Sequence, residues 1–158
     1  IIIAAQSVGI GQSALEAAVR FAQLRETFGK PIAQHQAIQF MLADMAVGVH
    51  TARVATMHAA SLMDAGQPFL QEASIAKLMA SEMCIDVANK AIQIHGATGV
   101  SQWTPLAGMY TRQRTLRLAD GPDEVHHFVV ARFELNRYQD GPGDIPMLDA
   151  TGPVFAGP

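Results

Sequence analysis

Arg25-Glu26-Thr27-Phe28-Gly29-Lys30-Pro31-Ile32 is the stretch that decides how this sequence of 158 residues is organised. It separates two long runs in which apolar residues recur every three or four positions, which is the period of an amphipathic helix. The glycine and the proline of the stretch interrupt that period, because glycine costs a helix about 1 kcal/mol relative to alanine and proline removes a backbone donor. The stretch therefore predicts a turn between two helices, over residues 2–27 and 34–65.

Helical periodicity continues along the rest of the chain with short interruptions. We expect further helices over residues 69–95, 105–113 and 122–137, and no stretch shows the strict alternation of a half-buried strand. Long amphipathic helices with short connections are typical of a bundle in which each helix packs against its neighbours. The fold class predicted for residues 1–138 is therefore all-α, an antiparallel four-helix bundle.

The end of the chain, residues 139–158, differs from the rest because glycine and proline recur throughout it. Proline lacks the backbone donor that a helix or a central strand needs, and glycine weakens both. We interpret residues 139–158 as a Pro/Gly-rich tail or arm outside the bundle.

The composition excludes several classes of protein. Apolar residues make up 49% and charged residues 16%, as in a globular domain and unlike a disordered chain. The net charge of −3, without a cluster of Lys and Arg, argues against nucleic-acid binding. No apolar run approaches the roughly 20 residues that span a bilayer.

Cys84 is the only cysteine, which excludes a disulfide framework and favours a cytoplasmic location. The histidines lack carboxylate or cysteine partners at metal-ligand spacing, so no metal site is predicted.

Four motifs, in order along the chain, resemble the C-terminal domain of the acyl-CoA dehydrogenase family. The opening stretch reads Arg-x-x-Phe-Gly-x-x-Ile and is followed by residues 37–45, AIQFMLADM, which match the family's next helix start. Residues 93–99, QIHGATG, are similar to the family's Gln-Ile-His-Gly-Gly-x-Gly motif. Residues 120–125, DGPDEV, stand where the family has Glu-Gly-Thr-x-x-Ile.

The resemblance implies a fold and an activity. Family members bind FAD, oxidise acyl-CoA thioesters to 2,3-enoyl-CoA, and usually pass electrons to an electron-transferring flavoprotein. Their C-terminal four-helix domain follows an N-terminal helical domain and a β-domain, and only this last domain is represented here. The resemblance also implies a homo-oligomer, a dimer or tetramer, in which the turn at residues 25–32 reaches the flavin of a neighbouring subunit. We expect the isolated domain to be inactive.

By this resemblance, Asp120 is the candidate catalytic base that removes the proton from the α-carbon. It stands at the position of a family glutamate, and its side chain is one methylene shorter, about 1.5 Å. In an alternative interpretation Asp120 caps or flanks the last helix, whose dipole stabilises a carboxylate. A further alternative places the base upstream of Ile1, as in other branches of the family.

The resemblance also assigns residues that contact FAD. Arg25 is expected to bind the pyrophosphate of the partner subunit's flavin, since a guanidinium matches phosphate oxygens. Its alternative is a solvated arginine at a helix end. Thr27 and Phe28 are its expected companions, through a hydrogen bond and through packing. The remaining candidates are His35 and Gln36 at the same interface, Gln93, Gly96 and Ala97 near the nucleotide end of FAD, and Pro122 and Glu124, where the family has threonine and often glutamine.

Two other functions stay open at the level of sequence. A flavoprotein oxidase of the same superfamily, such as acyl-CoA oxidase or nitroalkane oxidase, carries similar motifs but returns electrons to oxygen. A non-catalytic helical oligomerisation module would keep the fold without the chemistry. Asp120, Ala97 and Pro122, which depart from the family pattern, are the reason to consider such a module.

Overall fold

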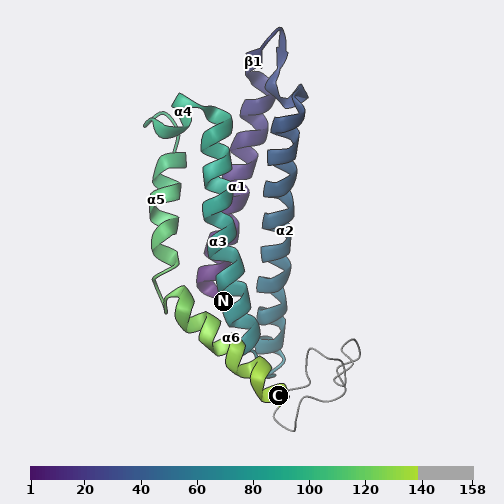
Figure 1. Cartoon of the computed structure of the whole chain (residues 1–158), viewed down its shortest axis with the longest axis vertical. Helices are drawn as coiled ribbons and strands as arrows, with labels where there is room; N and C mark the ends of the chain where they lie inside the picture. Colours follow the sequence, from purple (N-terminus) through teal and green to yellow (C-terminus); the bar gives the residue numbers. More distant parts are fainter. Residues whose placement is uncertain (139–158) are drawn as a thin grey trace, which may run out of the picture.

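Helices account for most of residues 1–138, the part of the chain that a computed structural model describes. They are α1 (Ile2–Leu24), α2 (Gln36–Asp64), α3 (Leu70–His95), α4 (Ala97–Val100), α5 (Leu106–Leu116) and α6 (Asp123–Arg137) (Figure 1). A hairpin of β1 (Glu26–Thr27) and β2 (Lys30–Pro31) and a 3-10 turn, η1 (Ile32–Gln34), connect α1 to α2. The predicted all-α class is confirmed, and the predicted tail at residues 139–158 lies outside the described residues.

α3 is the central helix of the bundle, and α1, α2, α5 and α6 all pack against it. Figure 1 shows α1, α2 and α3 side by side along the long axis, with α5 along α3 and α6 crossing the lower end. The helix expected at 122–137 therefore exists, but α5 and not α6 runs alongside α3. The chain changes direction between them at Asp120 and Gly121, which have φ angles of 53° and 96°.

Small side chains let α1 approach α3 closely. Gly11 on α1 faces Met83 on α3, and a Cβ at Gly11 would lie 2.9 Å from the Met83 sulfur. Short side chains at the contact allow two helices to pack at small separation. The fully buried alanines of these two helices are Ala4, Ala14, Ala18 and Ala22 on α1 and Ala76, Ala80, Ala88 and Ala91 on α3.

By length and composition alone, α1 is apolar enough to cross a membrane. Its residues Ala14 and Ala18 are fully buried inside the bundle, however, and the helix packs along both α2 and α3. This is the packing of a core helix, which passes the same compositional test.

The turn at residues 25–32 is a short β-hairpin, so the helix predicted to reach residue 27 ends earlier, at Leu24. Arg25 adopts extended backbone, and its carbonyl accepts a hydrogen bond from the N–H of Ile32 at 2.8 Å. Phe28 and Gly29 form the tip with φ angles of 52° and 76°, the left-handed conformation of a tight hairpin turn. Phe28 is 97% exposed, so the hairpin projects an aromatic side chain from the end of the bundle.

Cys84 should be unreactive in the folded chain. It is fully buried in the core, and this burial raises the pKa of its thiol to about 12, although a backbone hydrogen bond with Gly11 acts in the opposite direction. Since the thiolate is the nucleophile, only about 10⁻⁴ of the thiol is reactive at about pH 8. We expect a chromogenic disulfide reagent to label Cys84 only after unfolding in urea. Labelling of the folded chain at the rate of the unfolded one would contradict this.

Candidate functional site

The turn between α5 and α6 carries Asp120 in a left-handed conformation, with φ at 53°. This conformation costs a non-glycine residue about 1 kcal/mol, and aspartate tolerates it better than most. Hydrogen bonds from outside the turn stabilise it. The carbonyl of Asp120 accepts from His126 Nε2 at 3.2 Å, and the carbonyl of Gly121 accepts from Lys77 Nζ at 3.0 Å.

Behind the turn, Asp123 binds two cations. Lys77 Nζ lies 3.0 Å from one carboxylate oxygen, and Arg117 Nε donates to the other. Burial by itself raises the pKa of Asp123, but the hydrogen bonds from Arg117 and Lys77 outweigh it, so this pKa lies below its usual value. The hydrogen bond to Asp123 in turn raises the pKa of Arg117. Asp123 is therefore held as a carboxylate.

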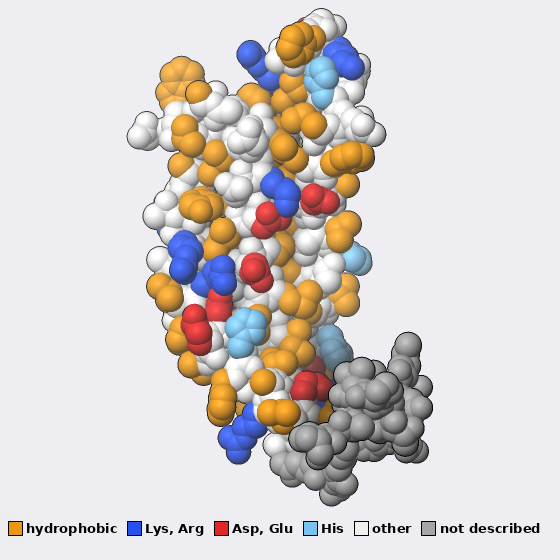
Figure 2. All heavy atoms as spheres, viewed as in Figure 1, with side chains coloured by type: hydrophobic (Ala, Val, Ile, Leu, Met, Phe, Trp, Pro, Cys, Tyr) orange, Lys and Arg blue, Asp and Glu red, His pale blue; other side chains and the backbone are white. Residues whose placement is uncertain are grey.

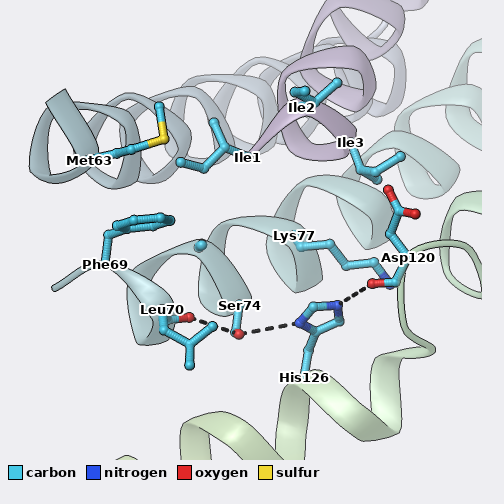
Figure 3. A pocket seen from close by; sticks show the side chains of 11 residues that line it. Ile1, Ile2, Ile3, Met63, Phe69, Leu70, Ser74, Lys77, Asp120 and His126 are labelled. Carbon is cyan, nitrogen blue, oxygen red and sulfur yellow. Dashed lines mark hydrogen bonds between the residues drawn. The ribbon is translucent and has the colours of Figure 1, made fainter.

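Asp120 borders a pocket of about 410 Å³ at the start of α1 (Figure 3). Figure 3 shows its carboxylate directed toward Ile3, while its backbone carbonyl faces His126. The apolar lining residues are Ile1, Ile2, Ile3, Met63, Phe69, Leu70 and Ala73, and the polar ones are Ser74, Lys77, Asp120 and His126. An exposed carboxylate thus lies against a largely apolar wall.

Asp120 does not cap α6. The N-terminal capping position is Pro122, and no side chain makes a capping hydrogen bond there. Pro122 thus precedes the helix, whose first residue is Asp123. Of the two parts of the alternative interpretation, capping is wrong, because no side chain caps α6, whereas Asp120 does flank the helix. Its carboxylate is left available to a ligand.

A second cleft, of about 440 Å³, lies at the opposite end of the bundle between the hairpin and the end of α3. The predicted cofactor-binding residues that line it are Arg25, Thr27, Gln93, Gly96 and Ala97. His35 is linked to it through Thr27, whose hydroxyl oxygen lies 3.3 Å from His35 Nε2. Phe28 contacts the edge of the His35 ring, with 6.2 Å between ring centroids, and Gln36 begins α2 directly after His35.

Phe21 and His95 complete this cleft, and the sequence did not assign either of them a role. Their rings stack with centroids 4.2 Å apart, and His95 Nδ1 donates to the carbonyl of Ala91 at 2.8 Å. Gly96 follows with φ 60° and ψ −139°, a conformation that glycine adopts without strain. Ala97 begins α4 and has no positive φ, so alanine fits where the family motif has its second glycine.

The length of α1 separates the two clefts. Ile1, Ile2 and Ile3 line the Asp120 pocket, whereas Arg25 follows the last residue of α1 and lines the hairpin cleft. At about 1.5 Å per residue, this helix of 23 residues is about 34 Å long. Pro122 and Glu124, the other predicted cofactor-binding residues, lie beside Asp120, far from Arg25. The structure thus divides the predicted residues between two ends of the bundle (Figure 1).

The donors of the hairpin cleft suit an anionic ligand with polar substituents. Arg25 contributes a guanidinium, Thr27 a hydroxyl and Gln93 an amide, and glycine at position 96 lets a ligand approach the backbone. Figure 2 shows basic and histidine side chains next to the apolar tip at this end of the molecule. This chemistry fits the phosphates and hydroxyls of FAD. Within residues 1–138, no group of three or more His, Cys, Asp or Glu is arranged to hold a metal ion.

Comparison with known proteins identifies the family. The family model for the acyl-CoA dehydrogenase C-terminal domain matches residues 1–135. Probable acyl-CoA dehydrogenase YngJ of Bacillus subtilis is 44% identical over 130 residues, which are 82% of this chain and 34% of that protein. The caffeyl-CoA reductase-Etf complex subunit CarC of Acetobacterium woodii is 40% identical over 135 residues, 85% of this chain and 36% of that protein.

A solved structure gives the same result. Butyryl-CoA dehydrogenase from Megasphaera elsdenii aligns with a TM-score of 0.83 at 36% identity, over 84% of this chain and 35% of that one. The chain therefore belongs to the acyl-CoA dehydrogenase family, of which it represents the C-terminal domain. It spans about a third of the length of these relatives. The family predicted from the four motifs is confirmed.

Proposed function

We propose that this chain is the C-terminal domain of an FAD-dependent acyl-CoA dehydrogenase that desaturates acyl-CoA thioesters between the α- and β-carbons. The observation that carries the proposal is the position of Asp120, an exposed carboxylate on a stabilised turn at the edge of a largely apolar pocket. A carbon acid needs a positioned base in a site with little water, and apolar walls such as Ile3 and Leu70 suit an acyl chain.

In this reaction Asp120 accepts the proton from the α-carbon as that C–H bond breaks. The β C–H bond breaks with its electron pair leaving as hydride, and the electron pair from the α-carbon forms the new double bond. FAD, when bound, supplies the hydride acceptor, which no side chain of the chain can replace. The contribution of Asp120 is therefore proton transfer, a role that requires it to be ionised before each turnover.

The separation of the two clefts supports an oligomeric site. The hairpin cleft and the Asp120 pocket lie at opposite ends of α1, a helix about 34 Å long, so a flavin held by the hairpin cleft is not the flavin beside Asp120 of the same chain. We propose that Arg25, Thr27, Phe28, His35, Gln36, Gln93, Gly96 and Ala97 contact the flavin of a neighbouring subunit. Pro122 and Glu124 would then lie near the flavin of their own subunit. This arrangement requires a homo-oligomer, a dimer or tetramer.

Replacing Arg25 with alanine should weaken the binding of FAD. A charge-assisted hydrogen bond to phosphate contributes about 1.5–3 kcal/mol, so we expect the dissociation constant of FAD to rise about tenfold or more. The measurement is flavin fluorescence during titration of the full-length apoprotein. Arg20→Ala is the matched control, since Arg20 is also exposed but lies within α1 and does not line the hairpin cleft. If the two variants bind FAD with equal affinity, Arg25 does not contact the flavin as proposed.

Anaerobic mixing of the full-length protein with acyl-CoA thioesters, from butyryl to palmitoyl, tests the proposed reaction. A dehydrogenase should lose its flavin absorbance and be reoxidised by electron-transferring flavoprotein, which we propose as its partner. CarC, a relative named as part of an Etf complex, supports that choice. Rapid reoxidation by oxygen alone would instead support the oxidase. A protein that binds no flavin, or whose flavin is not bleached by any acyl-CoA, would support the oligomerisation module.

A cytoplasmic location stays a prediction.

A further inference from the structure

We propose that His126 and Lys77 are positioning residues for the carboxylate of Asp120. The inference rests on the proposed role of Asp120 as the base. Each of the two side chains donates a hydrogen bond to one of the two consecutive carbonyls of the left-handed turn, those of Asp120 and Gly121. Neither side chain is directed at the carboxylate itself, so both act on the backbone that carries it (Figure 3).

The ring of His126 is held at both of its nitrogen atoms. Nε2 lies 3.2 Å from the carbonyl oxygen of Asp120, and since a carbonyl only accepts, this nitrogen carries a proton. Nδ1 lies 3.3 Å from Ser74 Oγ on α3, and that hydroxyl also lies 2.9 Å from the carbonyl of Leu70. The contact with Ser74 orients the ring so that Nε2 faces the carbonyl of Asp120. His126 thereby ties the turn to α3.

The turn and the ring also fit each other sterically. Gly121 has φ at 96°, where a side chain is strained, and a Cβ there would lie 3.2 Å from His126 Nε2. The imidazole of His126 therefore occupies the space directly beside Gly121. This contact favours the one turn conformation in which the carbonyl of Asp120 meets the ring.

Lys77 holds the second carbonyl from inside the bundle. It is 3% exposed, and its Nζ lies 3.0 Å from both the carbonyl of Gly121 and a carboxylate oxygen of Asp123. A buried ammonium needs such partners, because an unpaired charge in the interior is costly. The orientation of two successive carbonyls sets the backbone torsions on either side of Gly121, and with them the direction of the Asp120 side chain.

This support affects catalysis because Asp120 has a short side chain. A base displaced by about 1 Å can lose about 10²-fold in rate. An aspartate has only two side-chain torsions with which to correct a shift of its backbone. The position of its carboxylate is therefore decided largely by the turn, and the turn by His126 and Lys77.

His126→Phe is the informative variant, because it keeps a ring and removes the donor without breaking an ion pair. In the full-length flavoprotein, assayed with butyryl-, octanoyl- and palmitoyl-CoA, we expect kcat to fall about 10–100-fold with KM changed less than about twofold. The kinetic isotope effect for substrate deuterated at the α-carbon should increase. His126→Gln, which retains a donor, should recover most of the activity. The exposed neighbour gives the matched control, His127→Phe, which should behave as wild type.

A double-mutant cycle separates this inference from the function on which it rests. If His126 acts through Asp120, adding His126→Phe to Asp120→Asn should cause no further loss. Full turnover of Asp120→Asn would overturn the base itself. Suppose that Asp120→Asn is inactive and that His126→Phe has the same kinetics as His127→Phe. This result would still support Asp120 as the base, but it would overturn the positioning role of His126. Loss of bound flavin or of thermal stability in both His126→Phe and His126→Gln, without recovery by glutamine, would also overturn it.

Discussion

Replacing Asp120 with asparagine in the full-length flavoprotein should lower acyl-CoA turnover about 10²–10⁴-fold, the range that general-base catalysis contributes. An amide has nearly the shape of the carboxylate but cannot accept the α-proton. No side-chain hydrogen bond or ion pair within residues 1–138 uses the Asp120 carboxylate, so the substitution should leave the fold intact. The rate of flavin bleaching after anaerobic mixing with acyl-CoA measures the effect.

Two further variants make this result specific. Asp86→Asn removes an exposed carboxylate from α3, away from the Asp120 turn, and should leave turnover unchanged. Asp120→Glu extends the side chain by about 1.5 Å, to the length of the family glutamate, and should retain measurable activity because it keeps a base at this position. Undiminished bleaching by Asp120→Asn would instead assign proton removal to a carboxylate in another part of the full-length protein.

Asp123→Asn should cost the largest amount of stability, about 3–5 kcal/mol, which is typical of removing one partner from a buried ion pair. The substitution leaves the ammonium of Lys77, a residue 3% exposed, without its carboxylate, and it removes the partner of Arg117. Urea unfolding of the chain, followed by circular dichroism, gives the change in free energy of unfolding. Glu124→Gln is the control at the exposed neighbouring position and should change it by less than about 0.5 kcal/mol.

The cost of Asp123→Asn should also depend on pH, with a sign that the lowered pKa of Asp123 determines. The stabilisation is fully present above the unfolded-state pKa of about 3.9, and it is lost as the pH falls through the lower folded-state pKa. The difference between wild type and variant should therefore be constant near neutrality and shrink below about pH 4. A difference that persists unchanged into strong acid would show that the charge of Asp123 does not stabilise the fold.

The helices could be predicted from the sequence because their apolar period is local. The predicted ranges 34–65, 69–95 and 122–137 correspond closely to α2, α3 and α6. The hairpin could not be predicted in the same way, since strands of two residues are too short to show alternation. Its form depends on left-handed backbone at Phe28, which only the closure of the turn reveals.

The same distinction between local and long-range information applies to the residues of the candidate site. Asp120 and Arg25 could be proposed from their motifs, because a motif is defined by the type and order of its residues, which the sequence contains. Lys77 and His126 could not, since their partners lie 44 residues away at Gly121 and 52 residues away at Ser74. A lysine at position 77, among the alanines of α3, is a sign of a buried charge that the sequence does offer.

The sequence by itself determined the helical composition, the family and the residue types available for chemistry, because these depend on local periodicity and on motif order. Only the tertiary structure decided that α5 lies alongside α3, that α1 separates Arg25 from Asp120, and that two cations hold Asp123 beneath the turn. The physical reason is that packing and hydrogen bonding act between atoms close in space, whatever their separation along the chain.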